Sequence, residues 1–107
     1  MTPEIAYLRA RAVRWVDDYP FPGVVEVTLT DGSGMTWTFV DKYPMFDSED
    51  KLKPDSSYPI DLLLACTIVE RTGDGVTVST SEPWDLETVD GSFQLVTRPD
   101  QVLSSRR

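Results

Sequence analysis

Residues 24–40 contain two runs in which apolar and polar side chains alternate, and the segment D-G-S-G joins them. The apolar members of both runs fall on one face of an extended chain: Val25, Val27, Leu29, Met35, Trp37 and Phe39. Strict alternation is typical of a strand with one buried face, and a short glycine-rich segment is typical of a hairpin turn. The pattern therefore predicts a β-hairpin.

The chain before this hairpin allows two interpretations. Thr2-Pro3-Glu4 is a good start for a helix over residues 3–16, whereas R-A-R-A-V-R-W-V at residues 9–16 alternates as a strand does. We favour a strand over roughly residues 8–16, because a lone short helix gains less free energy than a strand paired with an adjacent hairpin. The prolines and glycine of residues 17–23 then predict a turn into the hairpin.

The chain after the hairpin predicts one long loop and three further strands. The loop covers about residues 42–59, where three prolines and mixed charges leave no hydrophobic period. The strands are expected at residues 60–71, 76–80 and 93–96, and L-L-L-A-C in the first of them indicates burial on both faces. Residues 81–89 are expected to form one helical turn or an irregular bridge.

These elements together predict an all-β fold. We expect five or six mostly antiparallel strands in a small closed or nearly closed barrel, OB-like or SH3-like, with a β-sandwich as the alternative. Beyond the first hairpin, the side chains expected to point inward are Leu62, Leu64, Val76, Val78, Phe93 and Leu95.

The 107 residues suffice for one hydrophobic core, so we expect a single domain over residues 1–107 with a frayed tail at about 103–107. The longest apolar run, residues 62–66, is too short to cross a bilayer, so no membrane partner is expected. No secretory signal is visible at the N-terminus, which favours a cytoplasmic location. Cys66 has no partner for an internal disulfide and is predicted to be a packed small hydrophobic residue.

The net charge of −8 is unevenly distributed along the chain. Residues 1–16 and 97–107 each carry a balance of +2, whereas residues 17–96 carry −12. An acidic body repels phosphate backbones, so no nucleic-acid partner is expected. The same charge promotes solubility, and it also suits a basic protein partner.

The residue types that most catalytic sites need are scarce in this chain. It contains no His and one Cys, so Ser–His–Asp sets, Cys–His pairs and the common zinc sites are excluded, and no phosphate-binding glycine motif occurs. Asp47, Glu49, Asp50 and Asp55 lack the spacing of a calcium loop. We therefore expect no catalytic residue, metal or cofactor, although carboxylates at the mouth of a barrel leave an enzyme or small-ligand binder open.

Three groups of residues are the candidates for binding a partner. The long loop displays Tyr43, Phe46, Asp47, Glu49 and Asp50, and the alternative is that its aromatic side chains fold back over the core. Trp84 lies among turn residues, where it is expected either to cap the core or to anchor a partner. The polar face of the first hairpin contributes a threonine-rich surface with Thr28, Thr36 and Thr38.

Several segments carry a resemblance to known proteins: V-R-W-V-D-D, P-G-V-V-E-V, W-T-F-V-D-K, Y-P-I-D-L-L-L-A-C and V-S-T-S-E-P-W-D-L-E-T. Across most of residues 12–90 the chain resembles a group of small bacterial all-β proteins of unassigned function. The resemblance implies a bacterial, stand-alone domain, and it implies no activity and no catalytic residue. From the residues themselves, we expect a non-enzymatic protein-binding module, immunity-type or regulatory, that is a monomer or a weak homodimer and binds a basic protein.

Overall fold

The computed structural model describes residues 4–46, 52–82 and 84–104, and strands dominate these residues. The strands are β1 (Ile5–Asp17), β2 (Val24–Thr30), β3 (Thr36–Lys42), β4 (Ile60–Arg71), β5 (Val76–Ser79), β6 (Gln94–Thr97) and β7 (Val102–Ser104). Two single 3₁₀ turns, η1 (Tyr43–Met45) and η2 (Pro99–Gln101), follow β3 and precede β7.

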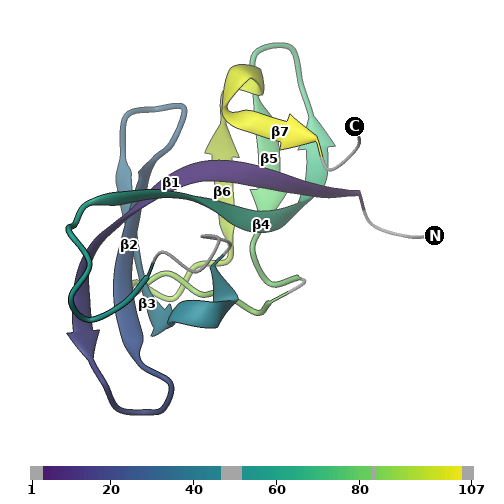
Figure 1. Cartoon of the computed structure of the whole chain (residues 1–107). Helices are drawn as coiled ribbons and strands as arrows, with labels where there is room; N and C mark the ends of the chain where they lie inside the picture. Colours follow the sequence, from purple (N-terminus) through teal and green to yellow (C-terminus); the bar gives the residue numbers. More distant parts are fainter. Residues whose placement is uncertain (1–3, 47–51, 83, 105–107) are drawn as a thin grey trace.

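All of these strands belong to one antiparallel sheet, which curls into a half-barrel (Figure 1). The strand order is β3-β2-β1-β4-β5-β6, so most neighbours in the sheet are also neighbours in the chain. β7 pairs with Ala6–Leu8 of β1, on the edge that β2 occupies further along the same strand. The all-β, antiparallel, barrel-like fold predicted from the alternation is confirmed.

Two backbone hydrogen bonds connect the β2–β3 hairpin with the far end of the sheet. The Gly32 amide donates to the Val96 carbonyl at 3.0 Å, and the Val89 amide donates to the Thr38 carbonyl at 2.9 Å. The first bond joins the β2–β3 turn to β6, and the second joins the β5–β6 connection to the outer edge of β3. The edges of the curled sheet are therefore partly covered by the chain itself.

The first segment is a strand, as favoured above, and it is longer than predicted. In its first half the even-numbered residues Ala6, Leu8, Ala10 and Ala12 are buried, because their side chains point into the half-barrel. Shifts in the β1–β2 register, between Ala12 and Arg14 and again between Trp15 and Asp17, then bend the strand. β1 therefore pairs with three strands and organises the whole sheet.

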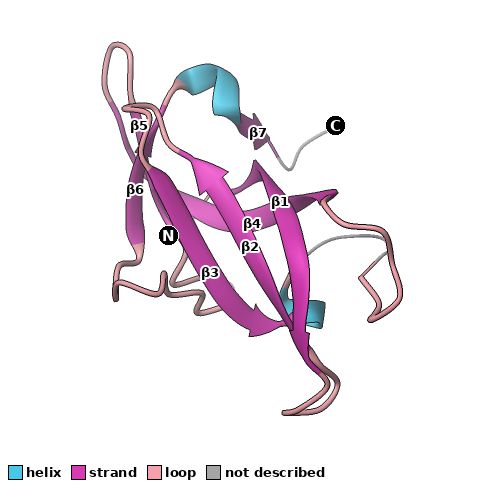
Figure 2. Ribbon diagram, turned by 90° about the vertical axis from the view of Figure 1, so that its left-hand side faces the viewer, coloured by secondary structure: helices cyan, strands magenta, loops and turns pink. Residues whose placement is uncertain are grey.

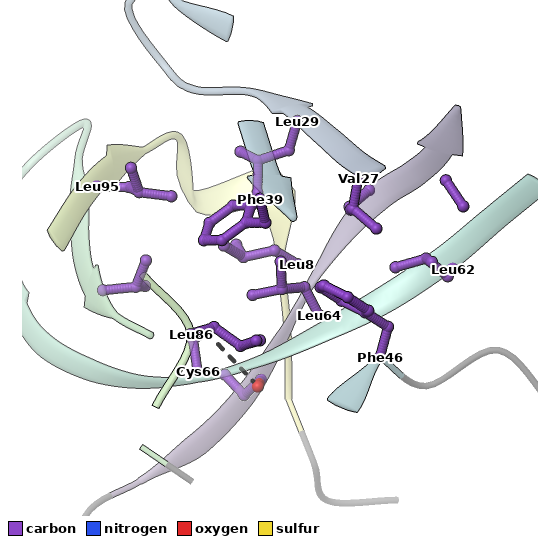
Figure 3. Close-up of a cluster of buried hydrophobic side chains, with 14 of the residues drawn as sticks. Leu8, Val27, Leu29, Phe39, Phe46, Leu62, Leu64, Cys66, Leu86 and Leu95 are labelled. Atoms are coloured by element: carbon purple, nitrogen blue, oxygen red, sulfur yellow. Dashed lines mark hydrogen bonds between the residues drawn. The ribbon is translucent and has the colours of Figure 1, made fainter. Parts of the chain in front are cut away.

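The core fills the concave side of the sheet, with side chains from most strands converging on it (Figure 3). Phe39 and Leu64 are fully buried at its centre, and both were predicted to point inward. The strand predicted to be buried on both faces is also confirmed, because residues 64–67 of β4 are all buried. Cys66 is fully buried, and the absence of water around it raises the pKa of its thiol to about 12.

Two details of the predicted hairpin and sheet are wrong, and one is only partly correct. Met35 was expected to point inward but is 56% exposed, because it belongs to the turn: its carbonyl accepts from the Asp31 amide. Residues 103 and 104 were expected to fray but belong to β7, while residues 105–107 lie outside the described residues. Trp37 and Phe93, also expected inside, are half-buried.

The predicted long loop folds partly over the core. Phe46 and Leu52 are buried, and both belong to the hydrophobic cluster. The Tyr58 hydroxyl donates to the Lys53 carbonyl at 2.6 Å, and burial raises the pKa of this phenol. The described part of this loop therefore acts as a lid on the core. Among the described residues, we find no helix of the length and hydrophobicity needed to cross a membrane.

Candidate partner-binding surface

The connection from β5 to β6, residues 80–93, carries the densest cluster of acidic side chains that the structure describes, and we call it the acidic loop. Its four carboxylate side chains are all exposed: Glu82, Asp85, Glu87 and Asp90. None of them forms an ion pair with a described residue, and the chain has no Lys or Arg between Arg71 and Arg98. The loop therefore presents uncompensated negative charge to the solvent.

The acidic loop is held by buried side chains at three positions. The side chains of Thr80, Leu86 and Thr88 are almost fully buried. The Thr80 hydroxyl donates to the Leu86 carbonyl, and the Leu86 amide donates back to the Thr80 carbonyl at 2.8 Å. The Thr88 amide donates to the Ser92 carbonyl at 2.9 Å, and the Thr88 hydroxyl oxygen accepts from the Ser92 amide at 3.0 Å. The loop is irregular, but its backbone polar groups are largely satisfied.

Two apolar side chains next to these buried positions are exposed to solvent. Trp84 is 50% exposed and Val89 is 60% exposed. Asp85 adopts a φ of +57°, a left-handed conformation that Asp tolerates better than most residues. Leu86, rather than Trp84, caps the core (Figure 3). Of the two roles expected for Trp84, capping is thus taken by its neighbour, and the indole remains available at the surface.

The threonine-rich face lies beside the acidic loop. The register pairs Thr28 with Thr38 and Thr30 with Thr36, which confirms that these side chains share one face of the hairpin. Thr28 and Thr38 are half-buried, whereas Thr36 is exposed. The bond from the Val89 amide to the Thr38 carbonyl connects this face to the acidic loop. Two of the three predicted candidate groups are thus neighbours.

The third group, in the long loop, is not a continuous surface. Phe46 is buried and unavailable to a partner, which confirms the alternative that it folds back over the core. Tyr43 is half-buried and packs against Trp15, with the ring centroids 5.8 Å apart. Asp47, Glu49 and Asp50 lie outside the described residues.

The buried carboxylate of Asp31 is the structural feature closest to a catalytic acid, and its hydrogen bonds explain its burial. One oxygen accepts from the Ser33 amide, the Ser33 hydroxyl and the Met35 amide at 2.8–3.0 Å. The other accepts from the indole N–H of Trp37 at 2.7 Å. Burial alone would raise the pKa of Asp31, but the four hydrogen bonds outweigh it and lower the pKa. Asp31 is therefore a cap of the β2–β3 turn that is ionised at neutral pH.

Two further carboxylates, Asp41 at the end of β3 and Asp61 at the start of β4, also have partners. Asp41 accepts from the backbone amide of Lys42, and Asp61 forms an exposed ion pair with Arg11 at 3.2 Å. The two carboxylates therefore do not form a shared site. Among residues 4–46, 52–82 and 84–104 there is no group of three or more Cys, Asp or Glu residues arranged to hold a metal ion.

Sequence reasoning missed one exposed feature entirely. The β1–β2 connection was interpreted only as a turn, yet its Tyr19 and Phe21 are the two most exposed of the large hydrophobic side chains that the structure describes. The signal in the sequence was the pattern Y-P-F-P, in which two aromatic residues alternate with prolines in a segment that cannot be a strand.

Comparisons with protein-family models, with curated proteins and with solved structures found no match to this chain. The resemblance to small bacterial proteins therefore stays a prediction. The most distinctive part of the described surface is the acidic loop, with four exposed carboxylates that form no ion pair with a described residue and an exposed Trp84.

Proposed function

We propose that this protein is a non-enzymatic protein-binding module, immunity-type or regulatory, that docks on a basic protein through its acidic loop. The observation that carries the proposal is the exposure of Trp84 and Val89 among four exposed carboxylates that form no ion pair with a described residue, on a loop held by buried side chains. An exposed apolar residue ringed by charge is a typical composition for the centre and rim of a protein interface.

Charge and aromatic surface contribute to such an interface in different ways. The carboxylates attract a basic partner from a distance and raise the association rate, an effect that salt weakens. Trp84 would contribute to affinity once it is buried, because Trp is enriched among the residues whose truncation most weakens protein interfaces. The hydrogen bonds within the loop reduce the entropy lost on binding. The threonine-rich face beside it would extend the contact without adding charge.

Two of the arginines of β1 form ion pairs, which makes them less available to contact the phosphates of a nucleic acid. Arg11 pairs with Asp61 at 3.2 Å, and Arg14 pairs with Glu26 at 2.7 Å. These pairs reduce the local positive potential that contact with phosphates requires. The distribution of charge thus favours a basic protein over a nucleic acid as the partner.

The alternative function, a carboxylate-based enzyme or small-ligand binder at the barrel mouth, has less support. It needs a buried acid whose pKa is raised toward neutrality. Asp31 is the buried acid among the described residues, and its pKa is lowered by four hydrogen bonds that leave it no catalytic proton. The hydrophobic side chains of Phe39, Leu64 and Leu86 fill the interior where a ligand would have to bind.

The test compares two quadruple variants that remove equal charge. One neutralises the acidic loop: Glu82→Gln, Asp85→Asn, Glu87→Gln and Asp90→Asn. The matched control neutralises four exposed acids elsewhere: Asp55→Asn, Asp61→Asn, Glu70→Gln and Asp74→Asn. The wild-type chain is first used to co-purify its partner from lysate of its native cells at low and high salt. The affinity of the purified partner for each variant is then measured by calorimetry.

We expect the wild-type chain to retain a basic protein at low salt and to release it at high salt. Neutralising the acidic loop should weaken binding by about 10- to 100-fold at low salt, mainly through slower association, and the control should change it much less. Equal losses in both variants would show that overall charge, rather than this loop, attracts the partner. The absence of any salt-sensitive basic partner would contradict the proposal.

A further inference from the structure

The tip of the β1–β2 hairpin, residues 18–22, presents two aromatic rings to solvent. Tyr19 is 79% exposed and Phe21 is 85% exposed. The connection between β1 and β2 extends beyond the curled sheet at the bottom of both views (Figures 1 and 2). The rings lie outside the hydrophobic cluster, whose nearest members in the sequence are Trp15 and Val25. They therefore do not serve the core.

The backbone of this tip is nevertheless well held. Asp17 accepts from the Tyr19 amide at 3.0 Å, and Asp18 accepts from the indole N–H of Trp15 at 2.8 Å. The Gly23 amide donates to the Pro20 carbonyl at 3.0 Å. The prolines at positions 20 and 22 fix two further φ angles. A tip restrained in this way loses little conformational entropy when it binds.

Trp15 supports the tip from the inside. It packs so closely on Gly23 that a Cβ atom there would clash with the indole ring, and Gly23 itself has a φ of +131°. Trp15 also contacts Tyr43, whose amide donates to the Gly23 carbonyl at 3.0 Å. Trp15 thus packs against the backbone of the loop, while Tyr19 and Phe21 are exposed on it.

We propose that Tyr19 and Phe21 insert into an apolar pocket of a protein partner, and that basic side chains surround this pocket. The base of the tip carries Asp17 and Asp18, both exposed, and Asp41 lies on the adjoining strand with Lys42 beside it. This local charge is negative, so it favours a basic rim and disfavours insertion into an anionic membrane surface. The inference rests on the proposed function only for the basic character of the partner.

The first step of the test identifies what contacts the tip. The full-length chain is made with p-benzoylphenylalanine in place of Phe21, and irradiated in lysate of its native cells. The matched control carries the same group in place of Val69, which is 53% exposed on β4 and distant from the tip in sequence and in the sheet. We expect one basic protein to crosslink at position 21 and not at position 69. Adducts with lipid, with a second copy of the chain, or with the same proteins at both positions would overturn the inference, as would no adduct at all.

The second step measures the affinity of that purified protein for three variants. The tip variant carries Tyr19→Ser and Phe21→Ser, the control is Val69→Ser, and the third is the neutralised acidic loop. We expect the tip variant to bind at least about 30-fold more weakly and the control to bind as the wild type does. A loss of less than tenfold would overturn the inference. If the neutralised acidic loop alone weakens binding, the proposed function stands and the tip is not its anchor; if the tip alone does, the reverse holds.

Discussion

The two connections at the ends of β2 reverse the usual relation between polarity and burial. At one end, the ionised carboxylate of Asp31 is 4% exposed; at the other, Tyr19 and Phe21 are 79% and 85% exposed. Both connections begin with Asp and both contain glycine. What differs is the number of hydrogen-bond donors within reach and whether another part of the sheet lies against the turn. Burial in these two connections therefore depends on local partners more than on hydropathy.

The β2–β3 turn has both of these features. Four donors within six residues of Asp31 satisfy its two oxygens, so the charge can be buried without an ion pair to a described residue. The Gly32 amide bonds to β6, and the Gln101 side chain donates to the Thr30 carbonyl at 2.8 Å. The β1–β2 tip has fewer donors, because two of its residues are prolines without an N–H. Among the described residues, no backbone hydrogen bond joins Tyr19 or Phe21 to another strand.

The largest effect that the comparison predicts is the loss of the Asp31 carboxylate. Asp31→Ala would leave the Trp37 indole N–H and the donors of Ser33 and Met35 without their acceptor in a buried turn. We expect the free energy of unfolding to fall by about 2–4 kcal/mol, measured by urea denaturation at neutral pH. Asp31→Asn keeps one carbonyl acceptor and should lose less. A loss below about 1 kcal/mol for Asp31→Ala would show that water replaces the carboxylate.

The second prediction concerns the pH dependence of the same turn. The pKa of Asp31 is lowered below its ordinary value of 3.8 in the folded protein. The ionised form therefore stabilises the fold above pH 3.8, and this contribution is lost as the pH falls through the folded-state pKa. We expect the difference in unfolding free energy between wild type and Asp31→Asn to narrow as the pH is lowered from 6 toward 2.5. A difference that stays constant or widens would contradict the lowered pKa.

The fold could be predicted largely because most strands have one buried face. Alternation placed Val27, Phe39 and Leu95 in the core, and the L-L-L-A-C run identified a strand buried on both faces. The sequence-based predictions are wrong in two places. At Met35 the alternation of side chains continues beyond the paired residues of the hairpin, and β7 is too short for an alternation to be recognised. In both cases tertiary contacts determine the structure, and these contacts cannot be inferred from the alternation of apolar and polar residues.

The candidate surface could be predicted only in part. The sequence identified Trp84 and the acidic character of the chain. It did not show that Leu86 is buried while Trp84 is half exposed, or that Thr80 is hydrogen-bonded to Leu86. Y-P-F-P marked a turn, but nothing in four residues tells whether two rings pack inward or face water. That distinction depends on Trp15, which occupies the space beneath the tip.

The smallest predicted change in stability distinguishes the exposed aromatic residues of the β1–β2 hairpin from the one that packs against its backbone. Tyr19→Ser with Phe21→Ser removes two exposed rings that lie outside the hydrophobic cluster, so we expect the free energy of unfolding to change by less than about 0.5 kcal/mol. Trp15→Ser removes the half-buried ring that packs on Gly23 and Tyr43, and we expect a loss of about 1–3 kcal/mol. Both are measured by urea denaturation under the same conditions. If the double variant loses as much as Trp15→Ser, the exposed rings stabilise the fold, and their exposure no longer needs a partner to explain it. If it loses nothing, the chain maintains two solvent-exposed aromatic rings that its own stability does not require.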